Sequence, residues 1–425
     1  MLKACSGTRV IWSNEILSPS SVNTSDFIAN LKYVHENIFR RYRFKTFIFK
    51  DKEDGILDDM TLKERFVRSI KGEEVDKVPV CSVTQTGTVD LMELSGASWP
   101  QANYEPRQMA TLAIAGYEIA GFESVRYPFC TTVIAETLGC TIAEGSFDTQ
   151  PYQLDFPCKK KEDIKKITIP EDLLENRNIR TALESQSNCM GRISASNPNM
   201  RRIGTMLEAS GMIKQRIGDD VPLIAGMIGP AATAFYLAGA NNYLRWCITD
   251  PDALLELMDL GGTICAEYAN ALYDHGADAV IVIDSEAGPD LFPPPLFESL
   301  VLPVYQSLTS KMKGLKLLHM CGDATAILEP LADSGFQGLS IEEKVDVAYA
   351  SQMAGDDICL IGNVSPAETL LYKSREVIKR EAKQCIEDGI GILAPGCGIA
   401  PRTPLENLKA FVAARDEYYQ EKGLL

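Results

Sequence analysis

Residues 315–335 read LKLLHMCGDATAILEPLADSG. The apolar run Leu315–His319 is typical of a buried strand. Apolar residues then recur at the spacing of one helical face, at Ala324, Ile327, Leu328 and Leu331. Gly335 ends this pattern, as glycine commonly does at the end of a helix. A strand followed at once by a helix is the repeating unit of parallel α/β folds.

The same unit recurs along most of the chain. We expect strands at Val78–Val83, Ser124–Tyr127, Pro222–Met227, Ala279–Asp284, Leu315–His319, Gly338–Ile341, Ile358–Ile361 and Gly391–Ala394. Strands that alternate with helices pair in parallel, and eight such units predict a closed (β/α)8 TIM barrel. A doubly wound open sheet is the alternative fold, but no dinucleotide-type glycine fingerprint follows any of these strands.

Two segments do not fit the eight-unit pattern. The gap after the second strand, residues 131–220, is too long for one helix, so we expect an insertion with a hairpin near residues 140–156 and extra helices. Residues 1–59 show little periodic apolar pattern, and we interpret them as an N-terminal extension that is not part of the barrel. The barrel domain is then expected at residues 60–425. A short regulatory or partner-binding arm is the alternative interpretation of the extension.

Three capping boxes predict where helices begin. Ser365 and Glu368 form one of them, before the helix that follows the seventh strand. Thr61 and Glu64 have the required spacing before the first barrel helix, and Thr403 and Glu406 have it before the last one.

Composition excludes several classes of function. The formal net charge of −16 argues against nucleic acid or an anionic membrane surface as partner. The chain has no run of about 18 apolar residues that could span a bilayer, and its start lacks the apolar stretch of a signal peptide. Its 12 cysteines are scattered, as in proteins of a reducing compartment. The sequence therefore predicts a cytoplasmic protein.

Three residues combine into a candidate metal site. His319 is one of only three histidines, and strand alternation points it to the same side as Cys321. Cys397 follows the eighth strand, at the barrel end where catalytic residues gather. One imidazole and two thiolates suit tetrahedral zinc with a fourth position open to substrate. A core histidine beside a buried cysteine is the alternative, but it does not explain Cys397.

Two acidic residues are predicted to be catalytic. Glu342 ends the sixth strand, so we expect it to occupy the fourth metal position until substrate displaces it. A rim glutamate that pairs with Lys344 or Arg402 is the alternative. Glu343 should point the other way, because side chains alternate along a strand. Asp284 ends the fourth strand and is predicted to orient a ligand or bind substrate, with an ordinary barrel-rim aspartate as the alternative.

Three further residues are predicted to contact the cofactor or substrate. Arg126 ends the second strand, Asn363 follows the seventh and Arg402 follows the Cys397 loop. A guanidinium offers a planar fork of donors to an anionic group. A surface salt bridge is the alternative role of each arginine.

These motifs resemble those of a known family. Leu318–Asp323, followed by Gly396-Cys397-Gly398 and Thr403–Leu408, resembles the uroporphyrinogen decarboxylase superfamily and, within it, the methylcobamide:coenzyme M methyltransferases. Further matches are Met60–Arg65, Thr84–Thr88, Gly121–Glu123 and Ile228–Pro230. The resemblance covers roughly residues 60–421, nearly the whole expected barrel.

The resemblance implies a function. It implies one Zn²⁺ per chain held by His319, Cys321 and Cys397, and methyl transfer from a methylated corrinoid protein (a methyl-Co(III) cobamide) to a small thiol, with coenzyme M as the expected acceptor. Zinc would favour the reactive thiolate form of that thiol. Because the chain has no D-x-H-x-x-G motif of a corrinoid-binding module, the cobamide is expected on a partner protein.

Three alternatives remain at this stage. One is an enzyme of the same fold that uses another thiol or a methylated or ether substrate. A second is a porphyrinogen decarboxylase, which is disfavoured because the arginine-rich substrate motif of those enzymes is absent after Pro79, where Val80–Gln85 stands. The third is a zinc-binding scaffold for a corrinoid protein that does not itself turn over.

Overall fold

A parallel sheet forms the centre of the protein in a computed structural model that describes residues 60–170, 173, 201–355 and 358–424. Seven strands pair side by side in the order β1-β4-β5-β6-β7-β8-β9, and every neighbouring pair is parallel. They are β1 Val125–Tyr127, β4 Leu223–Ile228, β5 Ala279–Ile283, β6 Leu315–Met320, β7 Gly338–Ile341, β8 Cys359–Val364 and β9 Ile392–Pro395. The parallel pairing confirms the prediction made from alternating strands and helices.

The segment at residues 78–83 closes the sheet into a barrel. Val80 forms a parallel bridge with Leu393 of β9, and the Cys81 N–H donates to the Leu393 carbonyl at 3.0 Å. On its other side, the Val80 carbonyl accepts from the Glu123 N–H, which precedes β1, at 2.7 Å. The segment therefore lies between β9 and β1 as the eighth unit of the predicted (β/α)8 barrel.

This segment is less regular than the predicted strand. Two of its backbone N–H groups bond side chains instead of a neighbouring strand. The Val80 N–H donates to Glu123 Oε2 at 3.1 Å, and the Ser82 N–H donates to Ser124 Oγ at 3.3 Å. Pro79 has no N–H to donate. Regular strand pairing of this segment is thus limited to the bridge between Val80 and Leu393, although further backbone hydrogen bonds join it to β9 and to Glu123.

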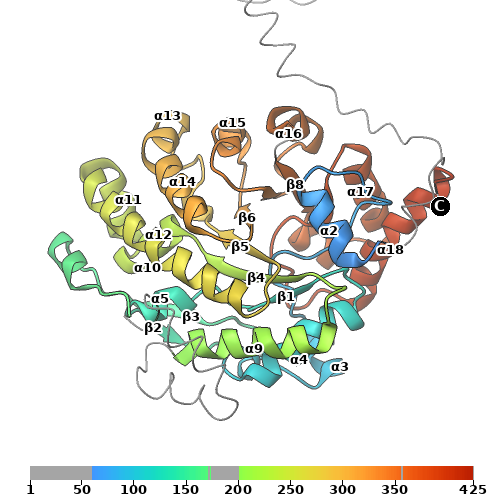
Figure 1. Ribbon diagram of the computed structural model, residues 1–425, viewed down its shortest axis with the longest axis horizontal. Helices are drawn as coiled ribbons and strands as arrows, with labels where there is room; N and C mark the ends of the chain where they lie inside the picture. The colour runs from blue at the N-terminus through green and yellow to red at the C-terminus, as the bar shows by residue number, and fades with distance from the viewer. Residues whose placement is uncertain (1–59, 171–172, 174–200, 356–357, 425) are drawn as a thin grey trace, which may run out of the picture. The chain divides into compact units, whose positions relative to one another are not determined.

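Helices surround the strands, as Figure 1 shows for α10, α12, α14, α17 and α18. The α-helices are α2 Leu62–Ile70, α3 Val89–Ser95, α4 Pro106–Glu118, α5 Val133–Thr137, α9 Arg201–Ile217, α10 Pro230–Ala238, α11 Ala240–Thr249, α12 Pro251–Asp274, α13 Pro294–Leu296, α14 Leu302–Lys311, α15 Leu328–Ala332, α16 Val347–Ala354, α17 Arg375–Glu387 and α18 Leu405–Glu421. Short 3₁₀ segments are η1 Gln101–Asn103, η2 Lys161–Lys166, η4 Ser285–Ala287 and η6 Thr325–Ile327, and π-helical segments are η5 Phe297–Val301 and η7 Pro366–Leu370.

The insertion after the second strand contains the predicted hairpin. Strands β2 Thr141–Ala143 and β3 Tyr152–Asp155 pair antiparallel, within the expected range of residues 140–156. Helices α5 and α9 and the η2 segment also belong to this insertion, which confirms the expected extra helices. Residues 174–200 and the predicted N-terminal extension, residues 1–59, lie outside the described residues.

Two of the three predicted capping boxes form their cap. The Ser365 hydroxyl accepts from the Glu368 N–H at 3.2 Å and caps η7. The Thr61 hydroxyl accepts from the Glu64 N–H at 3.1 Å and caps α2. The prediction for Thr403 is wrong, because its hydroxyl has no hydrogen-bond partner. Instead, the Leu405 N–H at the start of α18 donates to Asp90 Oδ2 at 2.7 Å, so a carboxylate from α3 supplies the cap.

The helix expected to run through residues 324–331 is split into η6 and α15. A continuous helix would need the Pro330 nitrogen to donate to the carbonyl four residues earlier, and proline has no N–H. The α-helix instead begins at Leu328, so that Pro330 falls in its first turn, where no donor is required.

Apolar side chains fill the barrel interior toward the end where the strands begin. Phe66 and Ile70 of α2 pack against a cluster that includes Ile281, Leu317 and Ile361. Because β7 begins at Gly338, next to Ile70, α2 lies across the end where the strands start. Polar side chains, among them His319 and Ser340, lie toward the opposite end, where the strands finish.

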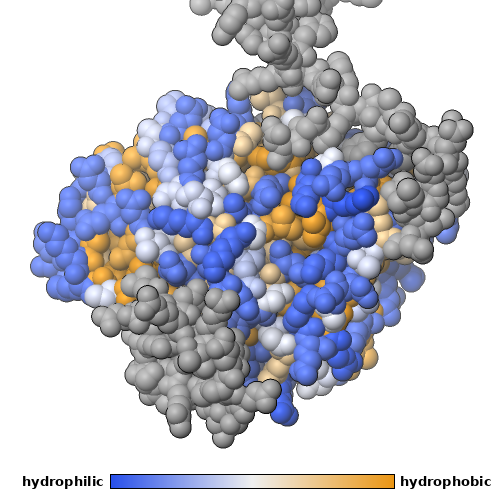
Figure 2. Space-filling model, viewed as in Figure 1, coloured by the Kyte–Doolittle hydropathy of each residue, from blue (hydrophilic) through white to orange (hydrophobic). Residues whose placement is uncertain are grey.

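The exposed face seen in Figure 2 is mostly hydrophilic, with hydrophobic residues in separate patches. Among the described residues, no helix combines the length and hydrophobicity needed to cross a bilayer.

Candidate metal centre

The structure brings His319, Cys321 and Cys397 together. His319 lies near the end of β6, Cys321 directly follows that strand, and Cys397 follows β9. His319 Nε2 lies 3.1 Å from Cys321 Sγ, and the two sulfur atoms lie 3.5 Å apart. All three ligand atoms lie within 4.8 Å of one another. The barrel thus joins groups that are 76 positions apart in the sequence.

This donor set fits a tetrahedral zinc ion. With Zn–S near 2.3 Å and Zn–N near 2.0 Å, tetrahedral geometry separates two sulfur ligands by about 3.8 Å and a sulfur from a nitrogen by about 3.6 Å. The separations in the structure are a few tenths of an ångström shorter, so a small outward movement of the side chains would admit the ion. Sulfur and imidazole nitrogen are also the ligand types that zinc prefers.

Three hydroxyl groups hold the ligands in place. Ser340 Oγ of β7 lies 3.0 Å from His319 Nδ1, which directs Nε2 toward the sulfur atoms. The Cys321 N–H donates to Ser285 Oγ at 3.3 Å, and the Thr84 hydroxyl donates to the Cys397 carbonyl at 2.8 Å. A second hydrogen bond on a ligating histidine fixes its ring orientation and tautomer. These supports are not apparent from the sequence, although Ser340 aligns with His319 in the ladder between β6 and β7.

The two thiols differ electrostatically because they are hydrogen-bonded to each other. The pKa of Cys397 is lowered, first by the hydrogen bond from Cys321 and further by the Gly398 N–H. The pKa of Cys321 is raised, because that same bond keeps its proton in place and burial disfavours its charge. The pair therefore supplies one sulfur that is readily ionised, and a bound cation would favour ionisation of both.

Glu342 and Glu343 both influence this pair. Each carboxylate raises the pKa of Cys397 through its negative charge. Among the described residues, the cluster of ligand atoms within 4.8 Å of one another contains no carboxylate, so the role of Glu342 as fourth ligand stays a prediction.

Glu343 does not behave as strand alternation predicts. Because β7 ends at Ile341, the alternation does not extend to Glu343. Its Oε1 accepts from the Ser365 hydroxyl at 2.9 Å, and a Cβ added to Gly396 would lie 3.2 Å from its Oε2. Glu343 thus lies beside the loop that carries Cys397, and the expectation that it points away is corrected.

Asp284 is directed away from the metal ligands. Its carboxylate accepts from the N–H groups of Ala231 and Ala232 at 3.2 and 2.6 Å and from the Tyr305 hydroxyl at 2.9 Å. Burial raises its pKa to about 7, whereas the bonds from Ala232, Tyr305 and Ala231 lower it. The side chain ties the end of β5 to the start of α10. These contacts agree with the structural alternative, and a catalytic role of Asp284 stays a prediction.

Asn363 and Arg402 both make contacts within the protein, and their predicted contacts with cofactor or substrate stay predictions. The Asn363 amide donates to the carbonyls of Glu342 and Val345 at 3.1 and 2.8 Å, and its oxygen accepts from the Cys385 thiol at 3.3 Å. These bonds support the loop after β7. The Arg402 side chain is 73% exposed and pairs with Asp148 of the insertion at 2.7 Å, which is the surface salt bridge considered as its alternative.

Arg126 is the one predicted anion-binding residue that is buried in the barrel. It lies on β1, and its Nε donates to the Val83 carbonyl at 3.2 Å. Burial lowers the pKa of Arg126 to about 10. Nη1 is buried without a hydrogen-bond partner, so this guanidinium can donate further hydrogen bonds.

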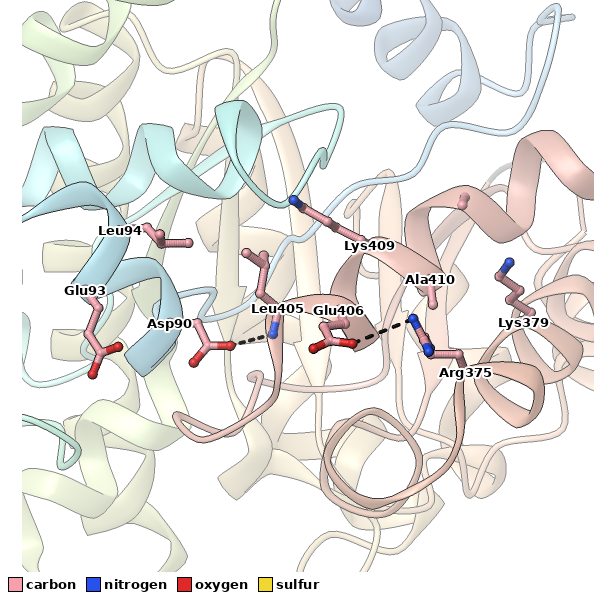
Figure 3. A pocket seen from close by; sticks show the side chains of 10 residues that line it. Asp90, Glu93, Leu94, Arg375, Lys379, Leu405, Glu406, Lys409 and Ala410 are labelled. Carbon is pink, nitrogen blue, oxygen red and sulfur yellow. Dashed lines mark hydrogen bonds and ion pairs between the residues drawn. The ribbon is translucent and has the colours of Figure 1, made fainter.

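A groove of about 610 Å³ lies on the flank of the barrel between α3 and α18 (Figure 3). Its lining residues are Asp90, Glu93, Leu94, Arg375, Lys379, Leu405, Glu406, Lys409, Ala410 and Ala413. Side chains of both charge signs face it, and Arg375 pairs with Glu406 at 3.6 Å. None of the three candidate metal ligands lines this groove, so it is separate from the site.

Comparisons with known proteins agree on one family. The family model for uroporphyrinogen decarboxylase (URO-D) matches residues 61–190 and 187–418. The methylcobamide:CoM methyltransferase MtaA of Methanosarcina barkeri is 42% identical over 364 residues, which cover 85% of this chain and 100% of that protein. The methylcobamide:CoM methyltransferase MtbA of Methanosarcina acetivorans is 32% identical over 365 residues, covering 85% and 99% of the two chains.

A solved structure extends this agreement to the fold. It is described as a methyltransferase from Methanosarcina mazei, has a TM-score of 0.76 and 41% sequence identity, and covers 85% of this chain and 100% of its own. The family model spans residues 61–190 and 187–418, which include β6 and β9 and the three clustered ligands. The chain therefore belongs to the uroporphyrinogen decarboxylase family, within the branch of the methylcobamide:coenzyme M methyltransferases.

Proposed function

We propose that this protein transfers a methyl group from a methylated corrinoid protein to the thiol of coenzyme M. The observation that carries the proposal is the cluster of His319, Cys321 and Cys397 at the end of the barrel where the strands finish. The relatives that match most of the chain are named as methylcobamide:CoM methyltransferases, which supports the same reaction.

His319, Cys321 and Cys397 would hold one zinc ion per chain. Bound there, zinc would supply a positive charge that favours the thiolate form of an incoming thiol at neutral pH. The protein's own residues prepare the site: Ser340 orients the imidazole, and Thr84 fixes the backbone of Cys397. The negative charge of two cysteinate ligands would keep the sulfur of the substrate electron-rich and nucleophilic.

The reaction balances as a nucleophilic displacement. The thiolate sulfur of coenzyme M forms a bond to the methyl carbon, while the cobalt–carbon bond breaks and leaves its electron pair on cobalt. The thiol proton passes to solvent. The chain has no corrinoid-binding motif of its own, so we propose that a partner protein brings the methylated cobamide to the barrel mouth.

The proposed cellular location is the cytoplasm. All ten cysteines among the described residues are free thiols, as expected in a reducing compartment.

Spectroscopy of free methylcobalamin tests the proposal. Zinc-loaded protein mixed with methylcobalamin and coenzyme M should convert the methyl-Co(III) spectrum to that of demethylated cobalamin and form methylated coenzyme M in equal amount. Coenzyme M is compared with cysteine, homocysteine and 2-mercaptoethanol to identify the acceptor. A protein that binds zinc but methylates no thiol, with free methylcobalamin or with a methylated corrinoid protein, would instead support the scaffold alternative.

A further inference from the structure

Four arginines are buried among the described residues, and three of them have carboxylate partners. Arg65 pairs with Asp76 and Glu123. Arg415 also pairs with Glu123. Arg202 pairs with Glu136 at 2.9 Å.

Arg126 differs from the other three. It is 2% exposed, and no carboxylate among the described residues pairs with it. Its one hydrogen bond goes from Nε to the Val83 carbonyl, and Nη1 has no partner. Burying an unpaired charge is strongly unfavourable unless a partner compensates it. The uncompensated guanidinium therefore indicates a site that an anion completes.

The barrel makes room for this guanidinium. Arg126 aligns with Ile224 of β4, and Ile224 belongs to the apolar cluster inside the barrel. Gly226, two residues further along β4, faces the same interior, because side chains alternate along a strand. A Cβ at Gly226 would overlap Nη2 of Arg126. The glycine thus allows the guanidinium to lie along the inner wall of the barrel.

Backbone contacts place Arg126 near the metal ligands. Its Nε bonds the carbonyl of Val83 at 3.2 Å, and the hydroxyl of the next residue, Thr84, bonds the carbonyl of Cys397 at 2.8 Å. With standard bond lengths between these atoms, Nε lies at most about 11 Å from the Cys397 carbonyl. An upper limit of this size allows a short substrate to have its sulfur at the metal ligands and its other end at Arg126.

We propose that Arg126 binds the negatively charged end of the thiol substrate. This inference rests on the proposed function, and the substrate class that it names is a short thiol carrying a sulfonate or a similar anionic group, as coenzyme M does. The planar guanidinium can donate two parallel hydrogen bonds to such a group. Arg126 then selects an anionic thiol over a neutral one of the same length and holds its sulfur toward Cys321 and Cys397.

Two thiols of equal linker length separate this role from a structural one. Coenzyme M and 2-mercaptoethanol both have a two-carbon linker, but only coenzyme M carries a negative charge. Arg126→Met should raise KM for coenzyme M about 10- to 100-fold, which corresponds to the loss of charge-assisted hydrogen bonds. The value of kcat/KM for 2-mercaptoethanol should stay within about threefold. Arg126→Lys keeps the positive charge but not the two parallel donors of the guanidinium. Its KM for coenzyme M should lie between those of the wild type and Arg126→Met.

A binding measurement needs no turnover. Ethanesulfonate has the anionic group but no thiol, so calorimetry should detect its binding to the wild-type protein and a large loss of binding to Arg126→Met. It should also inhibit the wild type competitively against coenzyme M. Arg216→Gln removes an exposed arginine that pairs with Glu118 on the barrel exterior and is the matched control for lost positive charge.

The outcomes keep the two proposals distinct. If Arg126→Met weakens both thiols by the same factor, or if ethanesulfonate binds both proteins equally, the assignment of Arg126 is overturned. If Arg402→Gln produces the selective loss instead, the anionic group binds at the rim. If the wild type methylates no thiol, the proposed function fails, and the ethanesulfonate titration still decides the role of Arg126.

Discussion

The Ser340 hydroxyl and the His319 imidazole form a 3.0 Å hydrogen bond between neighbouring strands of the barrel. This bond occupies Nδ1, so Nε2 is the nitrogen that faces Cys321. If the imidazole is neutral, Nδ1–H donates to the serine and Nε2 carries the lone pair that a metal requires. The orientation of the candidate ligand is therefore set by the strand next to it.

Replacing Ser340 should weaken metal binding without unfolding the protein. Loss of the outer partner of a metal-binding histidine typically lowers metal affinity about 10- to 100-fold, so we expect Ser340→Ala to release zinc to a competing chelator at correspondingly lower concentrations. Ser334→Ala is the control, because Ser334 is also buried but bonds the Leu331 carbonyl near the end of α15. Equal zinc affinity in wild type and Ser340→Ala would contradict the orienting role.

The purified protein should contain about one zinc per chain. Cys321→Ala and Cys397→Ala should each lose most of this metal and the methyltransferase activity, while the far-ultraviolet circular dichroism stays unchanged. Cys247→Ala, a partly buried cysteine of α11, should keep both. Elemental analysis of the four proteins measures the difference, and full zinc content in both ligand variants would refute the assignment.

Glu342 is predicted to occupy the fourth metal position until a thiol displaces it. The carboxylate is a harder donor than sulfur, so a thiolate should replace it on zinc flanked by two cysteines. Glu342→Gln should keep zinc but change thiol affinity or turnover, and X-ray absorption at the zinc edge should show a different fourth ligand in the thiol-free protein.

Glu343→Gln is the matched comparison, since Glu343 bonds Ser365 and also lowers the acidity of Cys397. It should leave the zinc spectrum unchanged. Identical thiol-free spectra in wild type and Glu342→Gln would mean that the carboxylate is not at the metal.

Asp284 should make the stability of the protein depend on pH. Its pKa is about 7 in the folded state and about 3.9 in an unfolded chain. Between these values the folded protein keeps a proton that the unfolded chain releases, so the contribution of Asp284 to stability decreases as pH rises from about 4 to about 7.

Asp284→Asn should remove this dependence. The difference in free energy of unfolding between wild type and variant should change by a few kcal/mol, on the order of 4, between pH 4 and pH 8. Asp274→Asn, on the surface beside Lys313, is the control. Urea unfolding at several pH values measures both, and a constant difference for Asp284→Asn would rule out the shifted pKa.

A chain that begins at Met60 should retain fold and activity. The family model begins its match at residue 61, and α2, which lies across the end of the barrel where the strands start, begins at Leu62. We expect the melting temperature to change by only a few degrees and the coenzyme M assay to remain active. Insoluble or inactive protein would show that residues 1–59 are required.

Much of the fold could be predicted because the hydrophobic pattern is local. Each strand of β4 through β9 is a short apolar run, and its position in the structure differs from the expectation by a few residues at most. The first strand, residues 78–83, could not be predicted in detail. Its irregularity arises because the side chains of Glu123 and Ser124, 43 and 42 positions away, accept hydrogen bonds from its backbone in place of a neighbouring strand. Such competition depends on tertiary contacts that periodicity does not contain.

The candidate site shows the same division. The grouping of His319, Cys321 and Cys397 follows from the rule that the ends of barrel strands meet, and the structure brings these three residues together. The same rule does not give the directions of the Asp284 and Asn363 side chains, because it locates a residue along the barrel axis but not toward its centre. Asp284 is directed to α10 and Asn363 to the loop after β7, and neither direction could be read from position alone.

The order of synthesis gives the distance between Cys321 and Cys397 a further meaning. A ribosome that has made the first seven strands has produced only two of the three ligands, since Cys397 comes after the last strand of the barrel. The complete set of three ligands cannot form before the chain is nearly finished and the segment at residues 78–83 has paired with β9. Under the proposed zinc assignment, metal uptake would follow barrel closure, so that only chains with a closed barrel would be loaded and truncated products would stay metal-poor.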